Sequence, residues 1–287
     1  MYSLKELQQI IETQLSKINL NAEPKELYEP VEYILSIGGK RLRPSLVLAA
    51  YNLFKDDVEN AIFPALALEV FHNFTLLHDD IMDKADLRRN QQTVHKKWSE
   101  NVAILSGDAM SIKAYELLAN VPAEFLTEVL QSFNKTALQV CEGQQLDMNF
   151  ENRLDVSVDE YIEMIRLKTS VLIAVSLKIG GIMGGASKND VQKLYDFGLN
   201  LGLAFQLQDD YLDSYGDVKV FGKKIGGDIL ANKKTFLLIK ALELSDSKNT
   251  DKLLSLIERN DIKDELKISQ VLEIYNETNV ASLLKEK

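Results

Sequence analysis

The sequence predicts an all-α protein, a single-domain bundle of long helices over residues 1–287. Three observations lead to this fold class. Apolar residues recur at i, i+3 and i+4 through long segments, alternating strand patterns are scarce, and none of the five prolines comes after Pro122. With 46% hydrophobic and 26% charged residues, a chain of 287 residues can bury a large core.

The helices follow one another with turn signals between them. In chain order we expect them at residues 3–18, 24–37, 43–54, 60–83, 97–120, 122–150, 157–182, 188–214, 231–244, 249–259 and 263–284. Glycine and proline mark the breaks at 38–40, 121–124, 180–190 and 216–228. We see no Ser/Gly linker and no low-complexity tract, which supports one domain.

The composition restricts the partners and the compartment. The net charge of −10 argues against a nucleic-acid partner, and an anionic substrate would need bridging cations or a local basic cluster. One cysteine, Cys141, excludes a disulfide framework and fits a reducing cytoplasm. The N-terminus is charged rather than signal-like, and Lys178 interrupts the longest apolar stretch. We therefore expect a cytoplasmic protein without a membrane span.

The same acid pattern, Asp-Asp-x-x-Asp, occurs twice, at Asp79, Asp80 and Asp83 and again at Asp209, Asp210 and Asp213. On a helix the first and last aspartates of each motif lie one turn apart, and the middle one is about 100° round. Each motif falls at the C-terminal end of its predicted helix, where the macrodipole disfavours carboxylates. Each cluster therefore costs free energy unless a cation compensates it.

Hard carboxylate oxygens suit Mg²⁺, which takes one or two carboxylates plus substrate phosphate oxygens. Two such helix ends could hold one diphosphate from both sides. The alternative is a solvated acidic helix end, and the duplication disfavours it. The His78-Asp79 doublet is also typical of one class of metal-dependent phosphohydrolases, but these need further histidines well upstream. The three histidines here, His72, His78 and His95, all lie within 24 residues.

Basic segments accompany the acids. They are GGKRLRP at 38–44, Arg88-Arg89 after the first motif, Lys168-Thr169 within a helix, and FGKKIGGDILANKKT at 221–235. Glycines let backbone N–H groups approach an anion, and Lys and Arg supply charge. Taken singly, each segment could instead be an ordinary turn, a helix-end charge pair, a lysine that reaches the surface, or a solvated loop.

Together these motifs resemble the trans-isoprenyl diphosphate synthases of the polyprenyl synthetase family. The resemblance covers about residues 28–240 and rests on GGKRLRP, His72, DDIMD, RR, KT, FQLQDDYLD and GKKIGGD in that order. It implies helices around a central cavity, usually a homodimer, and a head-to-tail condensation of isopentenyl diphosphate with an allylic diphosphate.

The resemblance also implies site residues by position. The two acid motifs would together hold three Mg²⁺ ions on the allylic diphosphate. Further allylic diphosphate contacts would be Arg88, Lys168, Gln206, Lys223 and Lys233, and the catalytic set would be Lys168, Thr169, Gln206 and Lys223. The metal-free isopentenyl diphosphate site would be Gly39, Lys40, Arg43, His72 and Arg89. No protein nucleophile is implied: diphosphate departs, the isopentenyl double bond attacks the allylic carbocation, and a proton is lost.

The chain departs from the family pattern after the first motif, where Arg-Arg-Gly-Lys-Pro is usual and RRNQQ stands here. Asn90 is well suited to the left-handed turn that glycine would make. The missing lysine bears on loop closure. The first motif also lacks the two-residue insertion common in bacterial farnesyl enzymes.

Product length in this family depends on residues before the first motif. Phe74, five residues before Asp79, would lie about one and a half turns below the metals and could block the growing chain. Thr75 is small where many farnesyl enzymes carry an aromatic residue, and Phe71 lies a further turn down. An ordinary core phenylalanine is the alternative for Phe74. The pattern resembles enzymes that make fifteen- or twenty-carbon products, with twenty preferred.

Two other functions share parts of this pattern. A class I terpene cyclase has the fold and the first acid motif, but its second metal motif normally mixes Asn/Asp, Ser/Thr and Glu, and it has no isopentenyl site. A non-catalytic subunit that tunes a partner synthase tends to lose an acid motif, and both are intact here.

Overall fold

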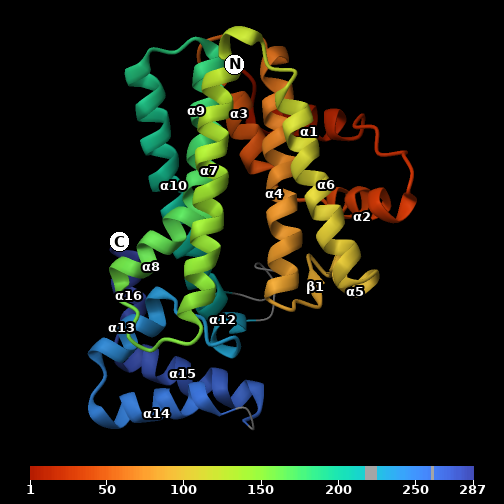
Figure 1. Cartoon of the computed structure of the whole chain (residues 1–287). Coiled ribbons are helices and arrows are strands. Elements are labelled where there is room, and N and C mark those ends of the chain that lie inside the picture. Colours follow the sequence, from red (N-terminus) through yellow and green to blue (C-terminus); the bar gives the residue numbers. More distant parts are fainter. Residues whose placement is uncertain (217–224, 260–261) are drawn as a thin grey trace. The chain divides into compact units, whose positions relative to one another are not determined.

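A computed structural model describes residues 1–216, 225–259 and 262–287, and they are helical almost throughout (Figure 1). The all-α prediction is therefore confirmed. The chain divides into two compact units. Unit 1 comprises Met1–Lys135 and Ile173–Phe197, and unit 2 comprises Thr136–Leu172 and Gly198–Lys287. A single domain stays a prediction.

Unit 1 is built around α4. Its elements are α1 (Leu4–Leu15), α2 (Lys25–Ser36), α3 (Leu42–Asn52), η1 (Glu59–Ala61), α4 (Ile62–Met82), β1 (Leu87–Arg88), β2 (Gln91–Gln92), α5 (Val94–Lys97) and α6 (Glu100–Leu118), with the first part of α7 (Ala123–Phe150) and parts of α9 (Val171–Gly184) and α10 (Lys188–Tyr215). Helix α6 packs along α4, α3 packs on α4, and α2 packs on α6 (Figure 1).

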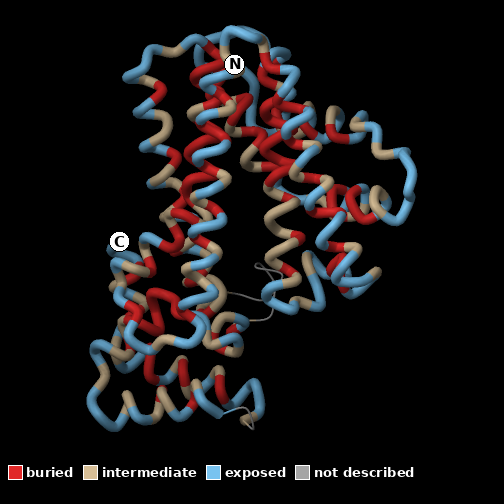
Figure 2. The backbone as a smooth tube through the Cα atoms, in the orientation of Figure 1, coloured by how far each residue is buried: buried red, intermediate tan, exposed pale blue. Residues whose placement is uncertain are grey.

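Burial changes along α4. Residues 64–71 are fully buried, whereas most residues from 72 to 81 are only half-buried (Figure 2). An apolar sequence on all sides explains the first part, because a helix that is hydrophobic all round must be covered all round. The half-buried part leads to the first acid motif and carries Phe74 and Thr75, two of the three residues expected to set product length.

Unit 2 has a core of its own. Its elements are the rest of α7, α8 (Val158–Ile165), η2 (Arg166–Ser170), the start of α9, the rest of α10, α12 (Gly227–Leu230), α13 (Phe236–Leu244), α14 (Ser247–Glu258), α15 (Asp264–Glu277) and α16 (Val280–Lys285). Buried side chains from α8, α10, α13 and α15, among them Tyr161, Leu207, Phe236 and Ile274, form one apolar cluster. Leu207 belongs to this cluster and Tyr211 packs against it, so the end of α10 that carries the second acid motif is anchored in the core of unit 2.

Several predicted boundaries were wrong for local reasons. The predicted helix 263–284 is broken near Asn279, whose φ of 55° is left-handed. The predicted helix 231–244 begins only at Phe236, because the Thr235 side chain caps it by accepting from Leu238 N. Helix α9 runs on to Gly184, inside the predicted break at 180–190. The β1–β2 hairpin was not predicted.

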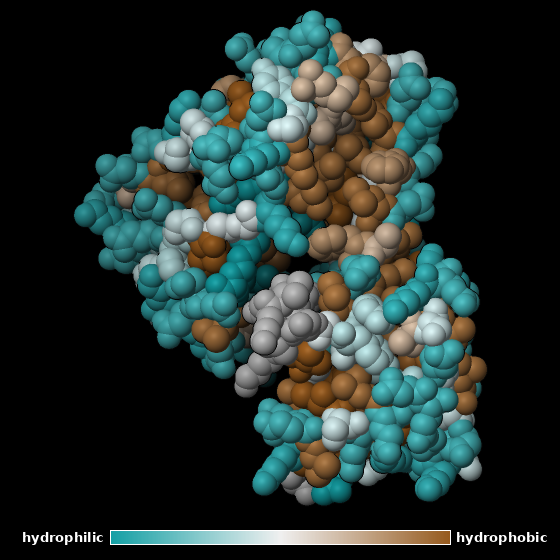
Figure 3. Space-filling model, turned by 180° about the vertical axis from the view of Figure 1, so that it is seen from behind, coloured by the Kyte–Doolittle hydropathy of each residue, from teal (hydrophilic) through white to brown (hydrophobic). Residues whose placement is uncertain are grey.

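Two helical stretches, Glu59–Met82 and Val158–Gly184, are long and apolar enough to be membrane-span candidates, but 61% and 83% of their apolar windows are buried inside the protein. Burial of this kind is typical of core helices. On the face in Figure 3, brown apolar side chains lie in patches between teal polar ones. In unit 1, α6 also exposes Leu105 and Ile112.

Candidate functional site

The first acid motif lies at the end of α4, as predicted. Asp79 and Asp80 occupy its last turn, and Asp83 is the C-cap residue. Arg88 binds the buried Asp80: its Nε donates to both carboxylate oxygens at 2.9 and 2.8 Å, and its Nη2 lies 2.7 Å from Oδ1. Burial raises the pKa of Asp80, and the hydrogen bond from Arg88 opposes that rise. A protein cation thus compensates part of the acid charge.

A hairpin directs Arg88 and Arg89 to different partners. Strands β1 and β2 pair antiparallel, and the turn residues Arg89 and Asn90 have φ of 51° and 62°. Positive φ at both central residues defines a type I′ turn, which favours asparagine. The expectation that Asn90 adopts a left-handed turn is confirmed. Arg88 contacts the acid motif, whereas the Arg89 guanidinium lies 2.8 Å from where a Cβ on Gly39 would be.

Gly39, Arg43, His72 and Arg89, which we call the basic group, come together in unit 1. Arg43 Nη1 lies 2.9 Å from His72 Nε2. Burial, together with Arg43 and Arg89, keeps the pKa of His72 well below its ordinary value, so the ring is neutral and its Nε2 accepts from Arg43.

The basic group combines neighbouring positive charges with an unsatisfied donor. Burial also lowers the pKa of Arg43 to about 10; Glu69 opposes this fall, and Arg89 adds to it. The buried Arg43 Nε has no hydrogen-bond partner among the described residues. A positive cluster with an unsatisfied donor is suited to an anion, and Gly39 allows Arg89 to lie against the backbone.

Two neighbouring bases behave differently. Arg41, with φ of 44°, turns inward: it donates to Glu12 and Glu69 at 2.7 Å each and to the Leu35 carbonyl at 2.7 Å. It therefore fixes the loop instead of facing a ligand. The predicted site residue Lys40 is exposed, and no described contact brings its side chain into the basic group.

The second acid motif lies near the end of α10 in unit 2. The Tyr161 hydroxyl donates to Asp210 Oδ2, and Gln206 Nε2 donates to Oδ1 at 3.0 Å. Burial raises the pKa of Asp210 to about 7, with a further rise from Asp228. Asp209 is half-buried beside it. As with Asp80 in the first motif, the middle aspartate is the buried one with protein partners.

Lys168 and Thr169 lie in η2, a π-helical segment inside the predicted helix 157–182. Lys168 Nζ donates to Asp147 Oδ2 at 2.6 Å, and Thr169 Oγ1 donates to Gln206 Oε1 at 3.1 Å. Single π turns are frequent at functional sites because they reorient side chains. The segment thus connects two predicted site residues to Asp147 and Gln206.

Two glycines flank this π segment. A Cβ on Gly143 of α7 would lie 2.3 Å from Lys168 N, and a Cβ on Gly202 of α10 would lie 2.5 Å from Ser170 Cα. No real Cβ contact is that short. The missing side chains therefore let α7 and α10 approach the backbone of η2.

The basic loop after the second motif is described only in part. The predicted residue Lys223 lies outside the described residues. Lys233 is exposed, whereas Lys234 is buried. Asp213 accepts from Asp228 N at 3.0 Å through its side chain, so the acid motif contacts the start of α12.

Two of the predicted product-length residues, Phe74 and Phe71, lie in one aromatic row. The Phe74 ring lies 4.7 Å from the His78 ring and 5.4 Å from the Phe71 ring, and Phe71 lies 5.0 Å from Phe133 of α7. The Thr75 hydroxyl donates to the His72 carbonyl at 2.8 Å. Its side chain is smaller than the aromatic residue that many farnesyl enzymes carry at this position. The rings of Phe74, Phe71 and Phe133 thus pack in sequence between α4 and α7.

Sequence reasoning missed Asp147, Tyr161 and Arg41. Gly143, in the middle of a long helix, was a usable signal for Asp147, because a glycine at such a place indicates close packing. We find no sequence signal for Tyr161, since a tyrosine on an apolar helix face is usually part of the core.

The donor set fits a divalent cation of the magnesium type. Among the described residues no three or more His, Cys, Asp or Glu side chains form a group that could hold an ion alone. Mg²⁺ does not require one, since it takes one or two carboxylates and completes its shell with phosphate oxygens and water. Asp79 and Asp83, like Asp209 and Asp213, offer such pairs one turn apart.

Comparisons with known proteins agree on one family. The family model "polyprenyl synthetase" matches residues 24–275. A short chain isoprenyl diphosphate synthase of Methanothermobacter thermautotrophicus is 41% identical over 259 residues, which are 90% of this chain and 80% of that protein.

Solved structures agree as well. A geranylgeranyl pyrophosphate synthase matches with a TM-score of 0.93 and 45% identity over 100% of this chain and 88% of that one. A polyprenyl synthase from Caulobacter crescentus, complexed with calcium and isoprenyl diphosphate, matches with a TM-score of 0.87 and 29% identity over 98% and 87% of the two chains.

Proposed function

The chain belongs to the polyprenyl synthetase family, and from this premise we propose how its residues divide the work of the reaction. The protein is a prenyltransferase that joins isopentenyl diphosphate to an allylic diphosphate to make a short-chain trans-prenyl diphosphate, and it uses a divalent metal. The observation that carries the assignment of residues is the split at Arg88 and Arg89: one binds the acid motif and the other joins the basic group.

In this proposal the two acid motifs bind the allylic diphosphate. Asp79 and Asp83, with Asp209 and Asp213, would hold three Mg²⁺ ions, which would supply positive charge to the diphosphate. Asp80 and Asp210 act mainly as anchors, because their oxygens already bind Arg88 and the pair Tyr161 and Gln206. Further contacts to the diphosphate come from the residues implied by the resemblance: Arg88, Lys168, Gln206, Lys223 and Lys233.

The basic group, together with Lys40, binds isopentenyl diphosphate in this proposal. Its negative charge would satisfy the unpartnered Arg43 Nε and offset the repulsion between Arg43 and Arg89. No metal is needed there, because guanidinium groups and a neutral His72 supply the donors. The two diphosphates are thereby distinguished by chemistry, one bound through metal and one through protein cations.

The reaction then needs no protein nucleophile. Bound Mg²⁺ supplies charge that stabilises the leaving diphosphate. Lys168, oriented by Asp147, stabilises the developing negative charge as the C–O bond breaks and the electron pair leaves with diphosphate, and Thr169 holds the amide of Gln206 in place. The isopentenyl double bond attacks the allylic carbon to form the C–C bond, and the resulting cation loses a proton to the released diphosphate.

We propose a product of twenty carbons. Phe74 limits the space below Asp79, while Thr75 leaves more room than an aromatic residue would. The structural relative named as a geranylgeranyl pyrophosphate synthase favours the same length. Fifteen carbons is the shorter alternative.

A homodimer completes the proposal. Helix α6 exposes Leu105 and Ile112 at 60% and 63% of their surface, and residues seven apart lie on one helix face. A second copy of this chain would cover that face. The double variant Leu105→Glu and Ile112→Glu should then sediment as a monomer. We further propose a cytoplasmic location, without a membrane span.

A product assay tests the function. Purified protein with Mg²⁺ receives labelled isopentenyl diphosphate and dimethylallyl, geranyl or farnesyl diphosphate, and the products are dephosphorylated and sized by chromatography. A series that ends at twenty carbons supports the proposal. No incorporation by folded, dimeric protein would favour a product-tuning partner subunit, and cyclic hydrocarbons from the allylic substrate alone would favour a terpene cyclase.

A further inference from the structure

Two buried lysines of unit 2 bind the same residue, Asn232, and we call these three residues the Asn232 clamp. Lys267 of α15 donates through Nζ to Asn232 Oδ1 at 2.7 Å. Lys234 donates through Nζ to the Asn232 carbonyl at 3.0 Å and to the Glu151 carbonyl at 3.2 Å. The side-chain nitrogen of Asn232 donates to the Ile257 carbonyl at 3.1 Å. Asn232 is therefore fixed at both ends of its side chain.

The clamp fixes a strained backbone position. Asn232 has φ of 54°, in the left-handed region that asparagine tolerates better than most residues. It lies between the short helix α12 and Thr235, the cap of α13. Without the bonds to its side chain and carbonyl, this turn would lose the contacts that select one backbone conformation.

Helix α15 also contacts the other end of the same segment. A Cβ on Gly226 would lie 2.7 Å from Ile268 Cγ1, so Ile268 packs directly on the backbone there. Lys267 and Ile268 are neighbours on α15, and they contact residues 232 and 226 respectively. One turn of α15 thus fixes both ends of the 226–232 segment.

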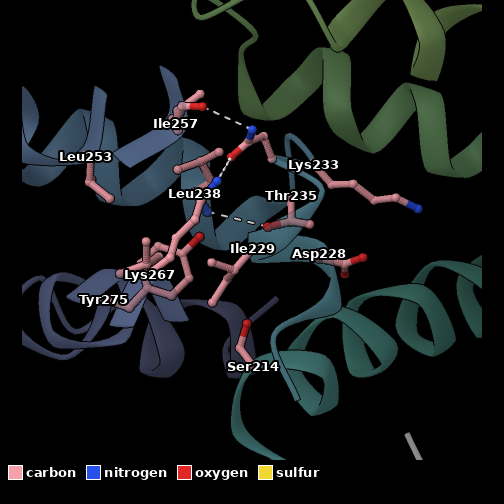
Figure 4. Close-up of a pocket in the computed structure, with 12 residues that line it drawn as sticks. Ser214, Asp228, Ile229, Lys233, Thr235, Leu238, Leu253, Ile257, Lys267 and Tyr275 are labelled. Atoms are coloured by element: carbon pink, nitrogen blue, oxygen red, sulfur yellow. Dashed lines mark hydrogen bonds between the residues drawn. The ribbon is translucent and has the colours of Figure 1, made fainter. Parts of the chain in front are cut away.

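The hollow beside the clamp is too small for a substrate. It is lined by Lys267, Tyr275 and Thr235, among others, and its volume is about 10 Å³, enough for about one water molecule (Figure 4). Lys267 is 6% exposed, and burial lowers its pKa. A methionine would fill the same space without the cost of desolvating an ammonium group. Its charge therefore needs a reason other than packing.

The 226–233 segment also carries side chains that point away from Lys267 and Tyr275. In Figure 4, Asp228 and Lys233 extend from the segment on the side opposite to Lys267 and Tyr275. The backbone N–H of Asp228 donates to the carboxylate of Asp213, the last aspartate of the second acid motif. Moving Asn232 would therefore move Lys233 directly and Asp213 through Asp228.

We propose that Lys267 is a positioning residue: through Asn232 it sets the conformation of the 226–233 segment, and so the placement of Lys233 and Asp213 toward the metal-bound diphosphate. The inference rests on the proposed role of these two residues. It assigns to α15, a helix that carries none of the residues singled out for chemistry, control over one of the two diphosphate sites. The basic group of unit 1 should not depend on it.

The test compares Lys267→Met with wild type in steady-state kinetics and in a binding assay without turnover. We expect kcat/KM for the allylic diphosphate to fall about tenfold, because small misplacements of charged groups are costly, while KM for isopentenyl diphosphate changes less than about twofold. The rise in melting temperature on adding Mg²⁺ with inorganic diphosphate should shrink. Lys267→Arg should restore part of both effects. Lys263→Met is the matched control, because Lys263 is the exposed N-cap residue of α15, four residues before Lys267.

A second variant protects the test against misfolding. Asn232→Gly removes the acceptor but keeps a residue that tolerates positive φ. It should reproduce the kinetic change of Lys267→Met, and the double variant should be no worse than either single one. Kinetic constants and diphosphate response equal to wild type in Lys267→Met would overturn the inference. An inactive wild-type protein would instead refute the proposed function.

Discussion

The guanidinium of Arg88 contacts both carboxylate oxygens of Asp80, at 2.9 and 2.8 Å from its Nε. Both carboxylate oxygens of Asp80 therefore have a protein partner. Asp210 of the second motif is in the same situation, with Tyr161 and Gln206 on its two oxygens. In both motifs the middle aspartate is tied to the protein.

This arrangement predicts different effects for neighbouring aspartates. Asp79→Asn should raise the Mg²⁺ concentration that gives half-maximal activity by about tenfold or more, because it removes a proposed metal ligand. Asp80→Asn should change that concentration less and instead raise KM for the allylic diphosphate, because Arg88 loses its bidentate partner. Titration of activity with Mg²⁺ at saturating substrates measures the first effect. Equal metal dependence in the two variants would contradict the division between the aspartates.

The aromatic row predicts the outcome of opening the floor. Phe74→Ala removes the ring that contacts both Phe71 and His78, so the growing chain gains space below Asp79. Chromatography of dephosphorylated products should show chains at least one five-carbon unit longer than those of wild type. Phe63→Ala, an exposed phenylalanine on the same helix, is the control and should leave product length unchanged. Unchanged length in Phe74→Ala would make this residue an ordinary core phenylalanine.

The close approach at η2 predicts that Gly143→Ala is harmful. In an exposed helix, Gly→Ala stabilises by about 0.5–1 kcal/mol. Here the new Cβ would lie 2.3 Å from Lys168 N. A backbone atom cannot relieve such a clash by changing rotamer, as a side chain can. Overpacking of this kind costs about 1–3 kcal/mol, so the net effect should be a lower free energy of unfolding.

The same variant should also lower kcat, because it displaces Lys168 from Asp147. Urea unfolding measures the stability, and Cys141→Ala, at an exposed position of the same helix, should leave it near wild type. A Gly143→Ala protein as stable and active as wild type would show that α7 and η2 separate at little cost.

His72 gives a pH dependence with a definite sign. Burial depresses its pKa well below 6.5, the ordinary value, in the folded protein. Above pH 6.5 both folded and unfolded chains carry a neutral ring, and the contribution is fully present. As the pH falls below 6.5, the unfolded chain takes up a proton that the folded one refuses. The free energy of unfolding should then fall by about 1.4 kcal/mol per pH unit from this group.

Urea unfolding of wild type and His72→Gln between pH 5 and 8 measures this contribution. The variant should lose less stability on acidification, so the two curves should diverge below pH 6.5 and run parallel above it. Parallel curves throughout would mean that His72 protonates in the folded protein.

The helix ends that carry the acid motifs could be predicted because spacing and apolar pattern are local properties of the chain. The left-handed turn at Asn90 could be predicted for the same reason. The orientation of Arg41 could not, since three bases stand in KRLR and only the backbone at residue 41 decides which one turns inward.

The partners of the middle aspartates were also beyond the sequence. Tyr161 and Asp210 are far apart in the chain, and nothing in the residues around either one indicates the other. The π segment could not be predicted either, because the sequence RLKTS is compatible with an ordinary α-helix. Only its packing against Gly143 and Gly202 distinguishes it.

The π segment carries a consequence for how such a chain can change. A π turn accommodates one residue more than the α-helical turn it replaces. Deleting one residue between 166 and 170 would therefore regularise the helix and leave α8 and α9 nearly in phase, so Tyr161 would stay beside Asp210. The side chains inside the segment would change direction, and Lys168 would leave Asp147. A change in residue count here thus removes the contacts of the π segment in one step, whereas single substitutions remove them one at a time.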